Sequence, residues 1–212
     1  MLLLCVLLTF NPGSGPAAAP TYYLEYTAQE GTSLERLSLF RDGMSVYKAR
    51  KPDAPDLLLK RQLSSEEIKV YLDAIRASRI LDLNDSMKPT LTGQLVKSWT
   101  LAVSLPGQEG RSFSGTTLQA PPLAVNTVLV LVQDLIETLL KKWRDTDPFG
   151  GRTPAIGDRL ESFEGHVYQV QRFVSERAQY ELRGIDQPMT YFIKADELKI
   201  FFKGYADPAG KP

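Results

Sequence analysis

The 212-residue sequence predicts an α+β protein: an antiparallel sheet with two packed helices, followed by a small all-β, barrel-like domain. Apolar and polar residues alternate with a period of two, as in strands, over much of both halves of the chain. Two longer stretches carry apolar residues at helical spacing. A segment rich in Asp, Gly and Pro separates the halves. The expected parts are an α+β domain at 21–145, a linker at 146–154, a barrel-like domain at 155–205 and a tail at 206–212.

Residues 1–20 form a signal-like segment. Leu2 to Phe10 is a mainly apolar run, and a helix of this length rises only about 14 Å, which is too short to cross a bilayer core of about 30 Å. The run suits the core of a secretory signal, and small residues follow it. We therefore expect export to the periplasm or the medium; the alternative is the N-terminus of a cytosolic protein. Cys5 lacks the small preceding residue of a lipoprotein signal, so lipid anchoring is not expected.

Composition excludes several classes of protein. Lys plus Arg and Asp plus Glu are 25 each, so the formal net charge is zero, and nucleic-acid binding, which usually needs a basic excess, is not expected. Cys5 is the only cysteine. Removal of the signal-like segment would leave no thiol, which excludes disulfides, thiolate catalysis and zinc–thiolate sites.

The first domain begins with strands. "YYLEYTAQ" and "LERLSLFRDGMSVYKAR" alternate apolar and polar residues, and Asp42-Gly43 between two such runs predicts a tight hairpin. "KPDAP" is expected as a proline-rich loop, and "DLLLKRQL" as a further strand.

A helix is predicted within "LSSEEIKVYLDAIRASRIL". Ser64 and Glu67 have the spacing of a capping box, in which each side chain satisfies a backbone N–H at the other residue. An apolar stripe follows at Ile68, Tyr71, Leu72 and Ile75. Glu66-Glu67 could also be read as a carboxylate pair for acid–base chemistry, but helix-start charges favoured by the dipole are the preferred interpretation.

The rest of the first domain continues the pattern. "DLNDSMKPTLTGQ" predicts a loop, "LVKSWTLAVSL" a strand, and "RSFSGTT" a returning strand after a Pro-Gly turn. A second helix is predicted from about Pro122 to Arg144, led by two prolines. Polar residues interrupt its apolar run, so it is interpreted as a core helix and no transmembrane span is expected.

Five short strands are expected in the second domain, in "DRLESF", "HVYQVQRFV", "AQYELRGI", "TYFIKADEL" and "KIFFKGY". Their spacing predicts a small barrel. Gly157-Asp158 followed by "FEGHVYQV" is similar to small bacterial barrels of the Src-homology-three type.

The order of features in the first domain resembles emfourin-like domains over Leu34 to Leu140. The features are "LSLFRDG", "LSSEEIKVYLDAIRASRILDL", "KSWTLAVSLPGQEGRSFS" and a proline-led helix. Emfourins are small bacterial inhibitors of thermolysin-type metalloproteases, with many exported relatives. "RDGMSV" lacks the glycine-rich loop expected near the inhibitory edge, so the resemblance assigns no inhibitory residue.

No catalytic, metal or cofactor site is predicted. His166 is the sole histidine and is interpreted as a turn or strand-edge residue. Asp145 and Asp147 lack the further oxygen donors of a calcium loop. Five aromatic residues are dense near the C-terminus, and the preferred interpretation is that they fill the core of the small barrel: Tyr191, Phe192, Phe201, Phe202 and Tyr205. One or two of them should be exposed, and the candidate contact residues for a partner are Tyr191, Phe192, Phe201 and Tyr205.

The leading hypothesis is an exported bacterial binding protein without catalytic activity, which recognises a protein or a cell-wall glycan and needs no cofactor. A second hypothesis is an inhibitor of a secreted metalloprotease. A third is a glycan-acting enzyme that uses carboxylates alone, which would require a cleft with two carboxyl groups about 5–10 Å apart.

Overall fold

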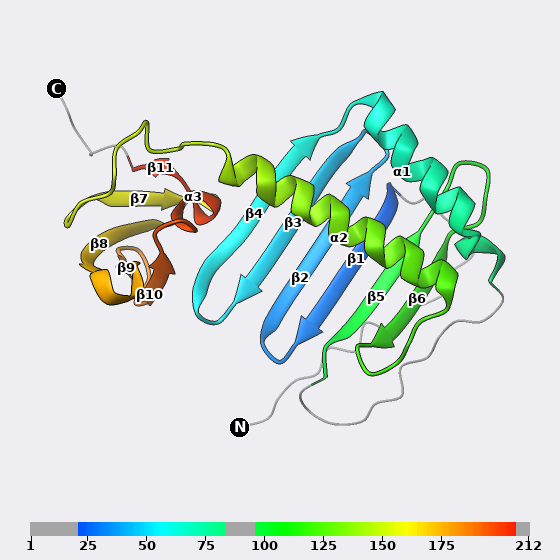
Figure 1. The fold of residues 1–212 in the computed structure, drawn as a ribbon, viewed down its shortest axis with the longest axis horizontal. Coiled ribbons are helices and arrows are strands. Elements are labelled where there is room, and N and C mark those ends of the chain that lie inside the picture. Colours follow the sequence, from blue (N-terminus) through cyan, green and yellow to red (C-terminus); the bar gives the residue numbers. More distant parts are fainter. Residues whose placement is uncertain (1–20, 84–95, 207–212) are drawn as a thin grey trace.

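The computed structural model describes residues 21–83 and 96–206, which form two antiparallel sheets and three α-helices (Figure 1). The predicted α+β class is confirmed. The signal-like segment, nearly all of the predicted loop at 82–94 and most of the tail lie outside the described residues.

The first sheet has six strands in the order β4-β3-β2-β1-β5-β6, and every neighbouring pair is antiparallel. The strands are β1 (Tyr22–Glu30), β2 (Ser33–Phe40), β3 (Met44–Lys51), β4 (Ala54–Gln62), β5 (Ser98–Val103) and β6 (Arg111–Thr116). Two helices, α1 (Ser65–Ser78) and α2 (Leu123–Arg144), cover one face of this sheet (Figure 1). The other face carries no helix in the described part of the chain.

The predicted hairpin at Asp42-Gly43 joins β2 to β3. The Gly43 N–H donates to the carbonyl of Phe40 at 3.0 Å, and the Met44 N–H donates to the Asp42 carboxylate at 2.9 Å. Gly43 has a φ of 85°, and a Cβ there would lie 2.5 Å from Cδ1 of Ile68 on α1. The positive φ of the turn therefore favours glycine, and any side chain there would also have to displace the end of the Ile68 side chain.

Helix α1 begins at the predicted capping box. The Glu67 N–H donates to Ser64 Oγ at 3.2 Å, and the Ser64 N–H donates to Glu67 Oε2 at 2.8 Å. The Ser64 N–H holds the pKa of the Glu67 carboxyl below its usual range, with the Arg61 charge as a further cause. The Glu67 carboxylate is thus used to cap the helix. This supports the interpretation of Glu66-Glu67 as helix-start charges rather than as a carboxylate pair for acid–base chemistry.

Helix α2 runs diagonally across the sheet (Figure 1). Its buried residues are Val125, Val128, Val132, Leu135, Ile136 and Leu139, at the spacing of one helical face. By length and composition alone, α2 could cross a membrane, and it is the one such helix among the described residues. Its apolar face instead packs on the first sheet, as expected for a core helix.

The second sheet has five strands in the order β10-β9-β8-β7-β11. The strands are β7 (Arg159–Ser162), β8 (Val167–Val174), β9 (Gln179–Gly184), β10 (Thr190–Lys194) and β11 (Phe202–Tyr205). These strands form the predicted small all-β domain, but within the described residues it is not a clearly closed barrel, because β10 and β11 form the two edges of the sheet and do not pair.

The predicted fifth strand, "KIFFKGY", is also only half correct. Its first residues belong to a short helix, α3 (Leu198–Phe201), and only Phe202 onward is strand. Leu198, Ile200 and Phe202 are all buried, so burial alternates along the chain through the helix and into the strand. This alternation looks like strand periodicity in the sequence, and one turn of helix is too short to show a period of 3.6 residues.

The two sheets share their cores at one junction. The side chain of Ala54, at the start of β4, is 8 % exposed and belongs to the core of the second sheet. Phe201 of α3 packs against both cores, and the rings of Trp143 and Phe163 meet edge to face with centroids 4.7 Å apart. Helix α3 also contacts α2 and β4.

Residues 146–154, expected as a linker, pack against β11. The Phe149 ring lies 5.3 Å from that of Tyr205, and the Tyr205 hydroxyl donates to the Arg152 carbonyl at 3.2 Å. The Arg152 guanidinium also sits over the Tyr205 ring, 4.5 Å from its centroid. This edge of the second sheet is therefore occupied by the protein's own chain.

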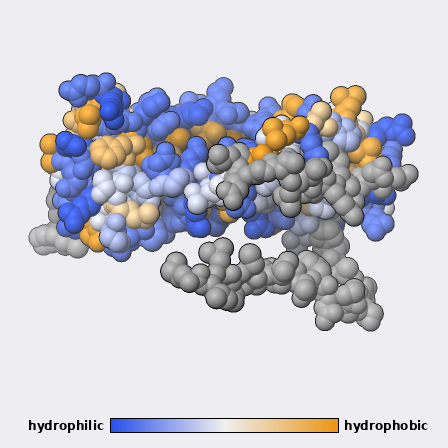
Figure 2. Space-filling view, turned by 90° about the horizontal axis from the view of Figure 1, so that it is seen from below, coloured by the Kyte–Doolittle hydropathy of each residue, from blue (hydrophilic) through white to orange (hydrophobic). Residues whose placement is uncertain are grey.

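The face of the molecule seen in Figure 2 carries, among the described residues, no single large apolar patch that would indicate a binding site. Seen from below the view of Figure 1, it is mainly hydrophilic, with apolar side chains in small separate groups (Figure 2). Scattered exposed apolar residues are normal on folded proteins. A candidate site must therefore be sought where the surface is concave.

Candidate functional site

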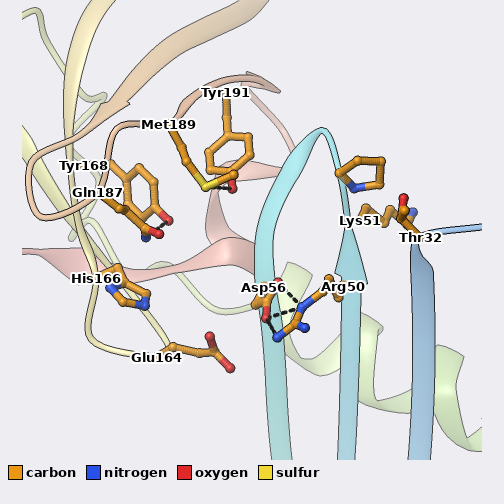
Figure 3. A pocket seen from close by; sticks show the side chains of 11 residues that line it. Thr32, Arg50, Lys51, Asp56, Glu164, His166, Tyr168, Gln187, Met189 and Tyr191 are labelled. Carbon is orange, nitrogen blue, oxygen red and sulfur yellow. Dashed lines mark hydrogen bonds and ion pairs between the residues drawn. The ribbon is translucent and has the colours of Figure 1, made fainter. Parts of the chain in front are cut away.

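Three hollows in the described part of the chain meet at the tip of the β3–β4 hairpin. Lys51, at this tip, lines three separate hollows. The largest, which we call the junction cleft, has a volume of about 360 Å³ and lies between the hairpin and the second sheet (Figure 3). A second, which we call the apolar groove, has a volume of about 240 Å³ and lies between β10, β4 and α2. Both hollows are built by residues of both sheets.

The hairpin side of the junction cleft carries an ion pair. Arg50 and Asp56 face each other across β3 and β4, and Nη2 of Arg50 lies 2.8 Å from Oδ2 of Asp56. The Arg50 Nε donates to the same oxygen at 3.0 Å (Figure 3). Two contacts to the same carboxylate oxygen hold the guanidinium against Asp56, so this wall presents an ion pair rather than a free charge.

The opposite wall comes from the second sheet and contains His166. The imidazole Nδ1 lies 2.7 Å from Oδ2 of Asp186, and the His166 backbone N–H donates to Ser162 Oγ at 3.1 Å. The hydrogen bond with His166 holds the pKa of the Asp186 carboxyl below its usual range. The pair ties the β7–β8 turn to the loop that precedes β10.

The other polar groups on this wall bond to one another. The Gln187 side chain donates to the Tyr168 hydroxyl at 2.8 Å, and the Tyr191 hydroxyl donates to the Met189 sulfur at 3.1 Å (Figure 3). Burial raises the pKa of both Tyr168 and Tyr191, so both phenols stay protonated at neutral pH. They act here as neutral hydrogen-bonding groups.

The junction cleft contains groups that could suggest catalysis, but their bonding favours a structural role. A histidine–aspartate pair supports a nucleophile only when a hydroxyl or thiol bonds to the imidazole. Ser162 Oγ bonds to the His166 backbone instead. Asp56 and Glu164 both line the cleft, as a carboxylate enzyme would need. However, the Asp56 carboxylate is already engaged by the Arg50 guanidinium in the ion pair described above.

Metal ligands do not gather in the described ranges. Within residues 21–83 and 96–206, no three His, Cys, Asp or Glu side chains are placed to hold a metal ion. The Asp147 carboxylate, considered above for calcium, accepts the Phe149 N–H at 3.0 Å and thereby closes a turn.

The apolar groove has a different character from the junction cleft. Apolar side chains make up most of its lining: Tyr47, Ala49, Ala54, Pro55, Leu57, Leu140, Phe192, Ile193, Ile200 and Phe201. Two cations, Lys51 and Arg144, and two anions, Asp53 and Glu197, also line it. Apolar surface with charged residues beside it is the arrangement expected of a site that binds another protein.

The four predicted contact residues divide among different places. Tyr191 is buried at 7 % exposure and faces the junction cleft. Phe192 is 49 % exposed and lines the apolar groove, where Phe201 forms part of the wall. Tyr205 packs against Phe149 and lines neither hollow. Successive residues of β10 point to opposite sides of the strand, so Tyr191 belongs to the core of the second sheet while the Phe192 side chain points away from that core.

The contribution of the hairpin tip could not be predicted from the sequence. "KPDAP" indicates a loop, but nothing local indicates that Ala54 enters the core of the second sheet. The groove combines β3, β4, α2, β10 and α3, which are separated by long stretches of chain. The local signals were limited to the two prolines and the dense aromatic residues near the C-terminus.

The sequence matches no protein-family model and no curated protein. The emfourin-like and Src-homology-three-type resemblances therefore stay predictions.

Proposed function

We propose that the protein is an exported, non-catalytic binding protein that recognises another protein at the apolar groove. The observation that carries this proposal is the half-exposed ring of Phe192 at a hollow lined by ten apolar and four charged residues. Phe192 differs in this respect from an isolated apolar residue on a convex surface. The apolar run from Leu2 to Phe10 supports the export part of the proposal.

A protein partner suits the groove better than a glycan. The lining combines apolar side chains such as Leu57, Leu140 and Ile200 with two cations and two anions. A carbohydrate hydroxyl buried against the apolar part of this lining would lose its hydrogen bonds to water without replacement, which is costly. An apolar side chain of a protein has no such cost and gains from leaving water.

Peptide selection tests the proposal directly. A phage-displayed library of random 12-residue peptides would be selected on the immobilised full-length protein, and the affinity of a selected peptide measured by fluorescence anisotropy. We expect Phe192→Ala to weaken this affinity at least tenfold, because a ring in a contact centre typically contributes more than about 1 kcal/mol.

Phe173→Ala is the matched control. Phe173 lies on β8 of the same sheet and is 46 % exposed, but it lines neither the groove nor the junction cleft. Its replacement should change the affinity less than twofold. Selection that yields no binding peptide, or peptides that bind equally well to the wild type and Phe192→Ala, would overturn the proposal.

A further inference from the structure

The backbone of β10 is unpaired on its outer side. In an antiparallel pair, successive residues alternate between those bonded to the neighbouring strand and those whose N–H and C=O point away from it. The Gly184 N–H donates to the Met189 carbonyl at 2.8 Å, and the Ala195 N–H donates to the Ala178 carbonyl at 2.9 Å. With the observed register, Tyr191 and Ile193 also bond to β9.

The residues between them therefore point outward. Thr190 and Phe192 direct both backbone groups to the free edge, and Lys194 directs its N–H there; the Lys194 carbonyl accepts the Glu197 N–H at 3.0 Å. Within the described ranges, the outward groups of Thr190 and Phe192 have no hydrogen-bond partner. All three residues are exposed, so these groups are open to a ligand.

The two edges of the second sheet differ. At β11, the chain's own segment lies so close that a Cβ on Gly204 would approach the Pro148 carbonyl oxygen to 3.0 Å. At β10, the neighbouring element is β4, which contacts it without forming a ladder (Figure 1). An exposed edge of this kind is a template for an added strand unless it is covered or charged.

The apolar groove adjoins this free edge. Phe192 and Ile193 of β10 line the groove, and the hairpin residues Asp53 and Pro55 form its other wall. A short segment bonded to Thr190 and Phe192 would have the groove beside it for a side chain. Backbone bonds at a strand edge combined with a side-chain pocket are an established way of binding extended peptides.

The charges around the groove indicate the net charge of the segment that could bind there. Lys51 and Arg144 are balanced by Asp53 and Glu197 around the groove, so its lining has no net charge. A strongly acidic or basic segment would meet as much repulsion as attraction there, whereas a segment of low net charge would not. The edge itself demands alternating backbone donors and acceptors, which polypeptides supply and glycans do not.

Resting on the proposed function, we propose that the partner segment is a short, extended polypeptide of low net charge. It adds to the free edge of β10 as a further strand, pairs with the outward groups of Thr190 and Phe192, and places one apolar side chain in the groove.

The first test uses the wild-type protein and the selected peptide, synthesised as a series with a single N-methyl group at each position in turn. An added strand directs alternate N–H groups toward β10, so we expect at least tenfold weaker binding at alternate positions of the bound segment and little change between them. A series without this alternation would overturn the added strand. If the peptide still depended on Phe192, the proposed function would stand, but the peptide would bind in a way other than as an added strand.

The second test compares Thr190→Pro with Thr190→Ala. Proline removes an N–H that the β9–β10 ladder does not use, and it is tolerated at edge strands. We expect Thr190→Pro to bind the peptide about tenfold more weakly and Thr190→Ala to bind within twofold of the wild type, with similar circular dichroism spectra for both variants. Equal binding by the two variants would contradict the pairing, whereas failure to select any Phe192-dependent peptide would overturn the proposed function as well.

Discussion

Replacing Ala54 with aspartate should destabilise the protein by about 3 kcal/mol, because it buries a charge that has no partner. Ala54 is 8 % exposed and lies in the core of the second sheet although it belongs to a strand of the first. An aspartate at this position would have to place its carboxylate against this core or at the apolar groove that Ala54 also lines, whereas a lysine could extend its charge further into water. The substitution therefore acts on the contact that joins the two sheets.

Urea unfolding followed by tryptophan fluorescence and by far-ultraviolet circular dichroism would measure this effect. We expect one cooperative transition for the wild type by both probes, because the cores are shared. Asp53→Ala, at the exposed neighbouring position, is the control and should change the free energy of unfolding by less than about 0.5 kcal/mol. An unchanged transition midpoint for Ala54→Asp would contradict the shared core.

A matched pair of valines tests the packing of α2. Val132 is fully buried and Val130, two positions away on the same helix, is 59 % exposed. Val132→Ala should lower the free energy of unfolding by about 2 kcal/mol, since buried methyl groups are lost and a cavity remains.

Val130→Ala should have almost no effect or stabilise slightly, because alanine has the higher helix propensity. The same urea transitions report both variants. Equal losses of unfolding free energy at the two positions would contradict the packing of α2 through a single face on the sheet.

The sequence predicted those elements whose signals are local. The capping box at Ser64 and Glu67 and the Asp42-Gly43 turn each lie within a few residues, and their backbone bonds appear as expected. Helix α2 was predicted because its apolar stripe extends over several turns, which a strand pattern cannot imitate. The short α3 was missed because a single turn has no measurable period.

The candidate site could be predicted only in part. The aromatic residues near the C-terminus were identified only because they are closely spaced in the sequence. Phe192 is the one of the four that is about half exposed. The sequence could not distinguish Phe192 from its neighbour Tyr191, because which face of β10 is buried depends on the packing of the whole second sheet. The open edge of β10 likewise depends on β11 and β10 failing to meet, which is a property of the whole sheet.

Amide hydrogen exchange of β10, measured by NMR with and without the selected peptide, tests the central claim most directly. In the free protein, the amides of Tyr191 and Ile193 should exchange slowly and those of Thr190 and Phe192 rapidly, since only the former bond to β9. Saturating peptide should slow exchange at Phe192 and Thr190 at least tenfold. A Phe192 amide that still exchanges rapidly while the peptide is bound would contradict recognition by strand addition at this edge.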